Sequence, residues 1–592
     1  MRRSDPLLIE VAWETCNQVG GIYTVLRSKV PSMIQRWSKR YCLVGPYEPA
    51  TAGVEFEPAA LTGVFGQAVK QLREQGVDAH FGRWLVTGRP QVVLLDYRSV
   101  FNQLHEIKYR LWKNHHIETP AGDSLIDPVV ALAELVQRFL GILAQRQSGR
   151  RALVAHFHEW MAGAAIPMLR HRQWPGSIVF TTHATMLGRY LAMNDPRFYE
   201  HLPFYDPEAE AARFKVEPQF QIERAAAHGA QVFTTVSDVT ALECVHLLGR
   251  QTDMVLPNGL NIQRFERLHE LQILHRKFKQ KIHEFTMGHF FPSYSFDLDK
   301  TLYFYTSGRY EYRNKGMDMT IDSLVRLNQK LKATGTDKTI VAFIITRRPF
   351  KSINVQALQT RAMLDEFRAA SDTIKNKLGD RLMHAMARGH IPDLNTLVDD
   401  YWKLRMRRSI HAWKRSTPPT IITHDLVDDQ NDEVLNQLRA GRLWNQKDDP
   451  VKVVYHPDFI NPTSPLWRMD YDQFVRGCHV GIFPSYYEPW GYTPLESIAL
   501  GVPAATSDLS GFGSYVQQLL PEEKGLYSVM RKEKTFDEAA QGLADWLYSF
   551  TLLGRRERIS LRNSVENFAL HFDWHNLSKH YDEAHELALA RT

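Results

Sequence analysis

The chain has 592 residues, of which 44% are hydrophobic and 23% are charged. This composition is typical of a globular protein and excludes a largely disordered or collagen-like chain. The net charge of +6 is small for this length and gives no reason to expect a nucleic-acid partner. A local basic groove for an anionic ligand is still compatible with it. No apolar run reaches the roughly 18 residues of a membrane span, so no membrane partner is expected.

The cysteines indicate a reducing environment. Cys16, Cys42, Cys244 and Cys478 include no CxxC pair, and each lies in or beside an apolar run. This favours free thiols over disulfide bonds or a zinc site. The N-terminal sequence MRRSDPLLIEVAWE has only a short apolar run, which Glu10 interrupts, so it is a poor signal peptide. We therefore expect a cytoplasmic protein.

Short apolar runs alternate with helical patterns along the whole chain. In the first half, the expected strands are residues 7–13, 41–44, 92–96, 152–157, 177–183 and 231–237, with helical patterns such as 127–146 and 160–172 between them. In the second half, the expected strands are residues 301–308, 339–346, 420–424, 451–456, 479–485 and 502–507. This rhythm is typical of parallel sheets covered by helices. Because it occurs twice, we predict an α/β fold of two doubly wound, Rossmann-like domains with a cleft between them.

A charged helical stretch follows the sequence LPNG and predicts the boundary between the two domains. We place the first domain at residues 1–265 and the second at 266–567. Residues 352–414 contain two long, charged helical patterns, which is too much helix for one crossover connection. We therefore expect a helical insertion in the second domain. The C-terminal segment 555–590 is expected to be helical as well.

The stretch YYEPWGYTPLE carries the clearest chemical signal, because it holds Glu488 and Glu496 around a short loop. Its spacing fits a capping box with Thr493 as N-cap, Pro494 at the first helical position and Glu496 at the third. In that case Glu496 has a purely structural role. Glu488 lies in the loop and has no capping role.

The same stretch also fits a binding site. The loop 485–493 follows a buried strand and leads into a helix N-terminus, where backbone N–H groups bind phosphate oxygens. Gly491 allows the backbone to approach a ligand closely. Two acids beside an anion site are typical of glycosidic chemistry, which uses paired carboxylates against oxocarbenium-like charge.

The sequence TSGRYEYRNKG places Arg309 and Lys315 after another strand, between Gly308 and Gly316. Two cations at the carboxyl end of a strand suit a diphosphate leaving group. A solvated loop with surface charge is the alternative.

Other motifs are less specific. The pair Gly20–Gly21 indicates a tight turn after the first strand. His156, His158 and His183 end two strands, but they do not form an HExxH motif, so hydrogen-bonding or core histidines are favoured over metal ligands. In RRERISLRN, the arginines at 555, 558 and 562 share one helical face, which indicates an anion site or a solvated surface.

Several long motifs together resemble the glycogen synthases of the animal and fungal type, a glycosyltransferase family 3 group. They are EVAWETCNQVGGIYTVL, HFHEWMAG, TTHATMLGRYL, IERAAAHGAQVFTTVS, LPNGLN, GRYEYRNKG, HPDFI, IFPSYYEPWGYTPLES and LSGFGSY. The resemblance runs almost from end to end. It implies a GT-B fold in which the first domain takes the acceptor, the second binds the nucleotide-sugar, and the last helix, 568–592, packs back on the first.

The resemblance also implies a reaction: transfer of glucose from UDP-glucose, with retention of configuration, to the 4-hydroxyl at the non-reducing end of an α-1,4-glucan such as glycogen. No metal and no cofactor is expected. The residues with an implied catalytic role are Glu488, Glu496, Arg309, Lys315 and His183. Those with an implied role in substrate binding are Gly21, Arg189, Asn258, Tyr471, Trp490, Gly491, Tyr492 and Thr493.

Regulation and assembly follow from the same resemblance. His275, Lys279, Arg558 and Arg562 match a site for glucose 6-phosphate, although the continuation SVENF lacks further arginines of the regulated enzymes. The insertion 352–414 resembles a tetramer contact, so a homotetramer is expected. The sequence starts just before the first strand and ends with the last helix, so control by phosphorylated tails is not expected.

Three functions remain open at this stage. The first is the UDP-glucose-dependent glycogen synthase. The second is an enzyme of the same fold that prefers ADP-glucose or another acceptor. The third is a glucan-binding scaffold without catalysis, which the complete set of Glu488, Glu496, Arg309 and Lys315 disfavours.

Overall fold

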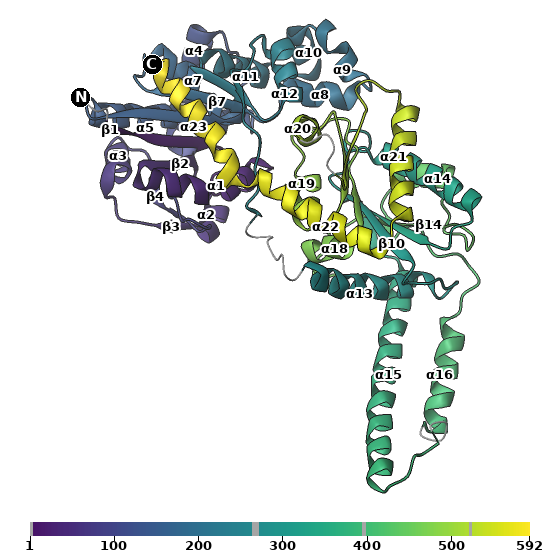
Figure 1. The fold of residues 1–592 in the computed structure, drawn as a ribbon. Helices are drawn as coiled ribbons and strands as arrows, with labels where there is room; N and C mark the ends of the chain where they lie inside the picture. The colour runs from purple at the N-terminus through teal and green to yellow at the C-terminus, as the bar shows by residue number, and fades with distance from the viewer. Residues whose placement is uncertain (1–3, 263–270, 394–397, 520–523) are drawn as a thin grey trace.

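The computed structural model describes residues 4–262, 271–393, 398–519 and 524–592 (Figure 1). It contains a nine-stranded sheet in the first half of the chain and a six-stranded sheet in the second half. The predicted domain boundary at 265/266 lies outside the described residues. Among those residues, no helix has both the length and the apolar character to cross a membrane. All four cysteines are buried and unpaired.

The first sheet has the strand order β3-β4-β5-β2-β1-β6-β7-β8-β9. Its strands are β1 (Ser4–Ala12), β2 (Tyr41–Pro46), β3 (Phe56–Pro58), β4 (Ala79–Trp84), β5 (Gln91–Leu95), β6 (Arg151–His158), β7 (Ser177–Thr182), β8 (Val232–Thr235) and β9 (Met254–Val255). At one edge, β4 pairs antiparallel with both β3 and β5, and the other neighbouring strands pair parallel. The parallel part has the doubly wound order, which reverses between β1 and β6.

Helices cover the first sheet on both faces. They are α1 (Ile22–Trp37), α2 (Pro49–Glu55), α3 (Gly63–Glu74), α4 (Leu104–His115), α5 (Ile126–Gln147), α6 (Glu159–Gly163), α7 (Ala165–His171), α8 (Met186–Asn194), α9 (Phe198–His201), α10 (Pro207–Phe214), α11 (Glu217–Gly229) and α12 (Asp238–Glu243). The pattern at 160–172 therefore forms two helices, α6 and α7, which meet at Ala164.

The second sheet is parallel throughout, with the order β14-β11-β10-β15-β16-β17. Its strands are β10 (Thr301–Ser307), β11 (Thr339–Ile345), β14 (Val451–His456), β15 (Val480–Ile482), β16 (Ala504–Ser507) and β17 (Leu526–Val529). In chain order within this half, the strands lie as 3-2-1-4-5-6, the Rossmann order, which reverses between β10 and β15. The prediction of two doubly wound sheets is confirmed.

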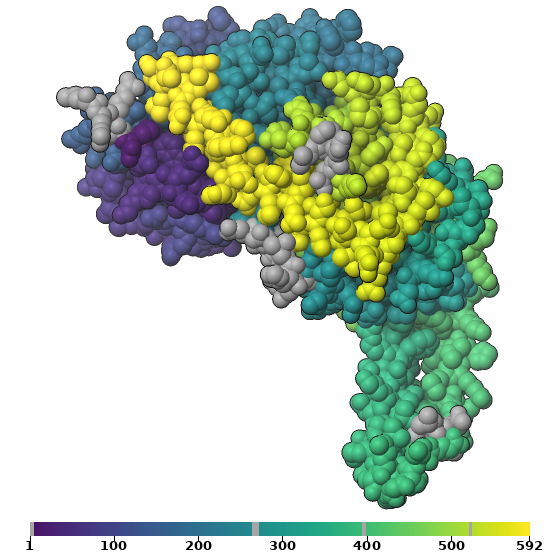
Figure 2. Space-filling view, viewed as in Figure 1, coloured from purple at the N-terminus to yellow at the C-terminus, as the bar shows by residue number. Residues whose placement is uncertain are grey.

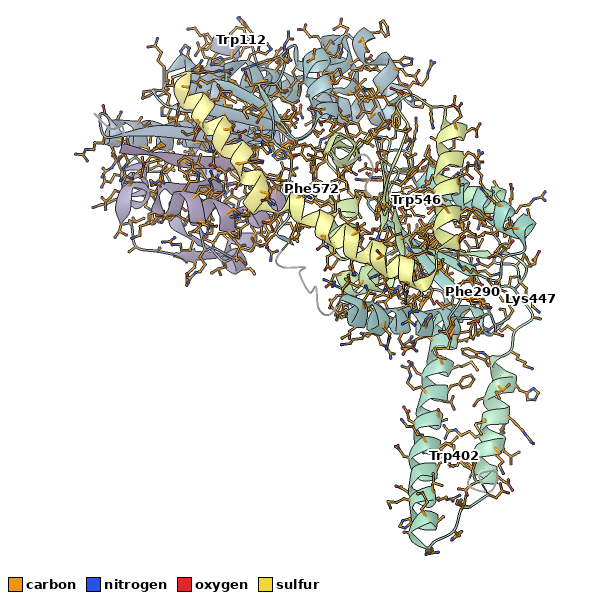
Figure 3. The ribbon with its side chains drawn as sticks, in the orientation of Figure 1. Trp112, Phe290, Trp402, Lys447, Trp546 and Phe572 are labelled. Atoms are coloured by element: carbon orange, nitrogen blue, oxygen red, sulfur yellow. The ribbon has the colours of Figure 1, made fainter. Side chains whose placement is uncertain are left out.

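The helices of the second half are α13 (Leu271–Phe290), α14 (Met317–Thr334), α15 (Val355–Ala387), α16 (Asp400–Trp413), α17 (Glu433–Ala440), α18 (Tyr471–Gly477), α19 (Tyr492–Ala499), α20 (Gly511–Leu519), α21 (Phe536–Leu552), α22 (Arg555–Ala569) and α23 (Trp574–Ala590). Figure 1 shows α15 and α16 as a pair that projects away from the second sheet. Trp402 of α16 is labelled in Figure 3, and the Lys377 ammonium of α15 lies over its ring, 5.4 Å from the centroid.

One expected strand of the main sheet, 420–424, is wrong. This segment returns from the α15–α16 insertion and makes only two backbone hydrogen bonds with β14, Tyr455 N to Ile421 O and Thr423 N to Tyr455 O. It then turns away as β13 (His424–Leu426), which pairs antiparallel with β12 (Phe350–Ile353) outside the main sheet. Of the residues 420–424, only His424 belongs to a strand, and Ile422 forms an isolated bridge with Tyr455, because the path of the returning insertion decides the pairing.

The C-terminal segment joins the two halves. Helix α22 lies against α19 in the second half, and after a short 3-10 turn α23 packs on α1 and β7 in the first half (Figures 1 and 2). At the junction, the Asp573 carboxylate accepts hydrogen bonds from the backbone N–H of Ile262 and His575. Phe572, labelled in Figure 3, packs on Phe512 of α20. The buried core is therefore continuous from one half to the other along this segment.

Candidate active site

The functional loops leave both sheets at the points where the strand order reverses. In the first sheet, β1 leads to the turn before α1 and β6 ends at His158. In the second sheet, β10 leads to the loop 308–316 and β15 to the loop 483–491. Ligands of doubly wound sheets bind in the crevice outside the carboxyl ends of the strands at such switch points.

Contacts between the halves hold the loops of the second sheet against the segments that follow β8 and β9 of the first sheet. The Tyr492 hydroxyl donates to the backbone carbonyl of Gly259 at 3.3 Å. The backbone at Gly511 packs so tightly that a Cβ there would lie 2.6 Å from the Cβ of Ser237. Nearby, a crevice of about 600 Å³ opens between the halves, lined by Tyr199 and Asp238 on one side and Arg531 on the other.

The start of α19 differs from the prediction. The helix begins at Tyr492, with Gly491 as N-cap at φ +114°, a conformation that glycine adopts without strain. Thr493 is therefore inside the first turn and makes no side-chain cap, so the predicted capping box is wrong. The positive φ of Gly491 moves the helix start two residues earlier than Thr493 and Pro494 suggest.

Glu496 lies in the first turns of α19 (Tyr492–Ala499), next to the loop that carries Glu488. It lies beside Tyr471 and Tyr492, since its carboxylate adds to the effect of burial in raising the pKa of both phenols. The Tyr471 hydroxyl is hydrogen-bonded to Ser307 at the end of β10. The structure therefore brings Glu496 and the ring of Tyr471 together at the second switch point.

Lys315 and Glu488 form the central contact of the second switch point. The Lys315 ammonium is paired with the Glu488 carboxylate, and their side chains are only 18% and 20% exposed. The loops that carry them are locked together, because the Asn314 carbonyl accepts hydrogen bonds from the backbone N–H of Tyr486 and Tyr487 at 2.9 and 3.2 Å. The structure thus confines a cation and an acid beside the N-terminus of α19.

Gly316 is required for this docking. It has φ +68°, and a Cβ at this position would lie 2.1 Å from the carbonyl oxygen of Pro484. Arg309, on the same loop, is 73% exposed and pairs with Glu311 at 3.0 Å. Its guanidinium is therefore open to solvent, while the Lys315 ammonium is mostly covered.

In the first half, His183 is buried and its Nε2 lies 3.1 Å from Nδ1 of His158. Asn258 is also buried, and its Oδ1 has no hydrogen-bond partner within the described part of the chain. Gly21 is the exposed N-cap of α1. Arg189 is half-exposed and its guanidinium lies 3.8 Å from Glu159.

Trp490, which the resemblance implies to bind substrate, is buried in the second half. Its ring is 4% exposed and packs on Phe512 and Tyr515 of α20, with centroids 6.1 and 5.9 Å away. The side chain therefore belongs to the core that supports the loop. A direct contact of this ring with substrate does not follow from its position.

Some residues of the site were missed by the motif analysis. The Glu14 carboxylate accepts hydrogen bonds from the backbone N–H of Gly20 and Tyr23, at 2.7 and 2.9 Å, and so fills the anion-binding position at the N-terminus of α1. The sequence did contain a signal for this role of Glu14, because it is a charged residue shortly before the glycine turn in the motif EVAWETCNQVGG.

Buried acids near Arg189 were missed as well. Glu223 accepts a hydrogen bond from the Thr182 hydroxyl at 2.5 Å, and Glu243 accepts one from Thr185 at 2.6 Å. Tyr487 of the second half donates to the same Glu243 at 3.3 Å, so this acid bridges the domains. Burial is the main cause that raises the pKa of Glu223 to about 8 and of Glu243 to about 7.

The residues expected to bind glucose 6-phosphate lie together between α13 and α22. His275 shares a hydrogen bond with the Arg476 carbonyl at 2.8 Å, and Arg562 donates to the Cys478 and Arg476 carbonyls at 3.2 and 3.3 Å. Burial lowers the pKa of Arg562 to about 9. Burial also lowers the pKa of Lys279, and the charge of Arg558 lowers it further.

One buried group in the described residues has the geometry of metal ligands. Atoms of Glu10, His156 and His158 lie within 4.8 Å of one another. The Lys29 ammonium already lies 2.5 Å from the Glu10 carboxylate. The charge of that carboxylate is therefore balanced by a protein cation.

The two doubly wound sheets, one in each half of the chain, have the architecture of a GT-B fold. The catalytic domain of starch synthase IV from Arabidopsis thaliana, solved with ADP and acarbose, has the same fold, with a TM-score of 0.54 and 12% identity over 99% of this chain and all of that one.

A sequence model of the family described as glycogen synthase matches residues 10–592. The chain is 42% identical to glycogen [starch] synthase of Neurospora crassa over 99% of this chain and 84% of that protein. It is 43% identical to isoform 2 of Saccharomyces cerevisiae and 40% identical to the human liver enzyme, over 99% of this chain and 86% and 84% of theirs. The chain belongs to the glycogen synthase family.

The buried acids predict how stability depends on pH. The folded-state pKa of Glu223 lies above its ordinary value of roughly 4.3, so the unfolded chain releases this proton first as the pH rises. The free energy of unfolding should therefore fall between about pH 4.5 and about pH 8, by about 1.4 kcal/mol per pH unit for this group. In Glu223→Gln, the melting temperature measured between pH 5.5 and 7.5 should depend less steeply on pH. The exposed acid of Glu74→Gln on α3 is the control, and an unchanged slope in Glu223→Gln would contradict the assignment.

Proposed function

We propose that the protein transfers glucose from UDP-glucose to the 4-hydroxyl at the non-reducing end of an α-1,4-glucan, with retention of configuration. The observation that supports this best is the Lys315–Glu488 pair, held beside the N-terminus of α19 at the switch point of the second sheet. A cation, an acid and a helix N-terminus together suit a diphosphate leaving group and the positive charge that develops on the sugar.

In this proposal, the uracil stacks on Tyr471, and the diphosphate lies against Lys315, Arg309 and the backbone N–H groups of Tyr492 and Thr493. These are donors and cations that stabilise the negative charge of departing UDP. Lys315 leaves Glu488 for the diphosphate as the donor binds. The protein supplies this charge itself, so the proposal includes no metal and no cofactor.

The glucose lies between Glu488 and the first domain, against His183 and within reach of Arg189 and Asn258. The unpartnered Oδ1 of buried Asn258 is an acceptor suited to a sugar hydroxyl. The acceptor hydroxyl attacks the face from which UDP leaves, which retains the configuration. Contacts such as Tyr487 with Glu243 close the halves around the reaction and exclude water.

The direct test is transfer of labelled glucose to glycogen from UDP-glucose and, separately, from ADP-glucose. We expect transfer from UDP-glucose, and a loss of roughly 10²-fold or more in Glu488→Gln, because the variant keeps the shape but removes the charge. Glu74→Gln is the control with the same chemical change at a distant surface. Faster transfer from ADP-glucose would favour the second donor, and transfer from neither donor would support a glucan-binding scaffold.

We also propose that the cationic cluster of His275, Lys279, Arg558 and Arg562 binds glucose 6-phosphate and raises the rate. Its charges converge where α13 and α22 meet. We expect the ratio of rates with and without the sugar phosphate to fall toward one in Arg558→Ala. Arg556→Ala, on the exposed side of the same helix, should keep the ratio of the unchanged protein. A chain that is not activated, or an Arg558→Ala variant that is activated normally, would refute this site.

The remaining proposals concern assembly and location. We propose a homotetramer held by α15 and α16, which project from the second sheet and expose Met386 and Leu404, and a cytoplasmic location, which suits the unpaired cysteines.

Light scattering should give the mass of four chains, and Met386→Asp with Leu404→Asp should lower it because charges are costly in an apolar interface. Leu552→Asp is the control, since Leu552 is equally exposed at the end of α21. A monomer before substitution, or an unchanged mass after it, would count against this interface.

A further inference from the structure

A line of buried polar side chains leads from the first strand to the proposed sugar position. Glu10 lies near the C-terminal end of β1, His158 ends β6, and His183 follows β7. The Nε2 atom of His158 lies 3.5 Å from Oε1 of Glu10. On the other side of the same ring, Nδ1 of His158 lies 3.1 Å from Nε2 of His183. His158 is therefore the connection between a carboxylate and the cleft.

The carboxylate at the start of this line is ionised. Burial alone would raise the pKa of Glu10, but Lys29 and His158 outweigh burial and hold it well below its usual range. The Lys29 ammonium lies 2.5 Å from Oε1, and the Tyr41 hydroxyl donates to Oε2. Glu10 is thus an acceptor only, with a full negative charge in a site closed to solvent.

Both histidines are neutral near pH 7. Burial is the main cause that lowers the pKa of His158 and, more strongly, of His183. Helix α23 closes the site from outside, with the ring of Tyr581 3.9 Å from the Lys29 ammonium. At such a buried position, the field of a nearby carboxylate acts strongly on a neutral imidazole.

These charges fix the position of each proton. A neutral imidazole has one N–H and one unprotonated nitrogen. Nε2 of His158 makes no hydrogen bond within the described residues, but it lies 3.5 Å from Oε1 of the ionised Glu10, so the carboxylate would repel an unprotonated nitrogen there. Nε2 of His158 therefore carries the proton, and its Nδ1 is the acceptor. Nε2 of His183, 3.1 Å from that acceptor, must then be the donor.

We propose that Glu10 and His158 are positioning residues that fix His183 as the Nε2–H tautomer, so that its Nδ1 accepts a hydrogen bond from a hydroxyl group of the donor sugar. This rests on the proposed function in one respect, namely that the glucose lies against His183. An N–H at the same Nδ1 could not accept from a hydroxyl, so the wrong tautomer would weaken the sugar contact while leaving the nucleotide contact unchanged. In metal sites, mutation of an outer partner that orients a histidine in this way typically lowers metal affinity or activity about 10–100-fold, and we expect a loss of similar size here.

The test compares His158→Leu with His158→Asn in the full-length protein. The two side chains are similar in size, but only asparagine can present an oxygen near the place of Nδ1 and accept from His183. We expect kcat/KM for UDP-glucose to fall about 10–100-fold in His158→Leu and most of that loss to be recovered in His158→Asn. The affinity for UDP, which lacks the sugar, should be the same in both variants as in the unchanged protein.

A second measurement needs no activity. In protein labelled with [15N]histidine, with His183 assigned by comparison with His183→Asn, the chemical shift of Nδ1 should be that of an unprotonated nitrogen. In His158→Leu it should move toward the protonated value. If the unchanged protein transferred no glucose, this result would still support or refute the tautomer, while the proposed function alone would fail.

The proposal is overturned by any of three results. One is a protonated Nδ1 of His183 in the unchanged protein. Another is a His158→Leu variant with kcat/KM within about threefold of normal. The third is an equal loss in both variants, or a parallel loss of UDP affinity, either of which would indicate that His158 only stabilises the fold.

Discussion

Two parallel sheets whose strand order reverses once impose the arrangement of every functional loop. At each reversal, neighbouring strands send their connections to opposite faces of the sheet, so a crevice opens at their carboxyl ends. The loops after β10 and β15 meet there and bring Lys315 to Glu488. The loops after β1 and β6 form the opposite wall, with Gly21 and His158. The site is therefore built from backbone connections that the sheets already require.

Charge is distributed differently over the two walls. In the second half, Lys315 and Arg309 remain partly exposed, where a ligand phosphate can reach them. In the first half, Glu10 and Lys29 are fully buried and paired. A buried ion pair contributes little net stability, because desolvation opposes its attraction. A positioning role for Glu10 gives this costly pair a function that stability alone does not supply.

The C-terminal segment lies against both the proposed glucose 6-phosphate site and the buried polar groups around Glu10. Helix α22 carries Arg562 into the cationic cluster on the second half, and α23 places His585 3.0 Å from His156 on the first. The two helices are separated only by the turn at Leu570–Phe572. A single stretch of chain thus touches both the proposed effector site and the polar groups beneath the cleft floor.

Sequence by itself determined most of the central parallel strands and the family, but it missed strands at or next to a sheet edge, such as β4 (Ala79–Trp84) and β17 (Leu526–Val529). Apolar runs such as 301–308 and 339–346 are long and strongly patterned, and the motif around Glu488 depends only on local order. Predictions from local spacing were wrong where a backbone conformation or a distant part of the chain sets the boundary of an element. The start of α19 depends on the positive φ of Gly491, and the partner of β13 depends on the path of the insertion.

Tertiary structure alone decided which side chains meet. Trp490 is in the core because α20 packs on it, and Tyr487 reaches Glu243 from the other domain. The line from Glu10 through His158 to His183 joins three separate strands of the first sheet. A pKa shifted by burial and a fixed tautomer both depend on which side chains surround a group. Because these neighbours lie far apart in the chain, no local sequence pattern predicts either property.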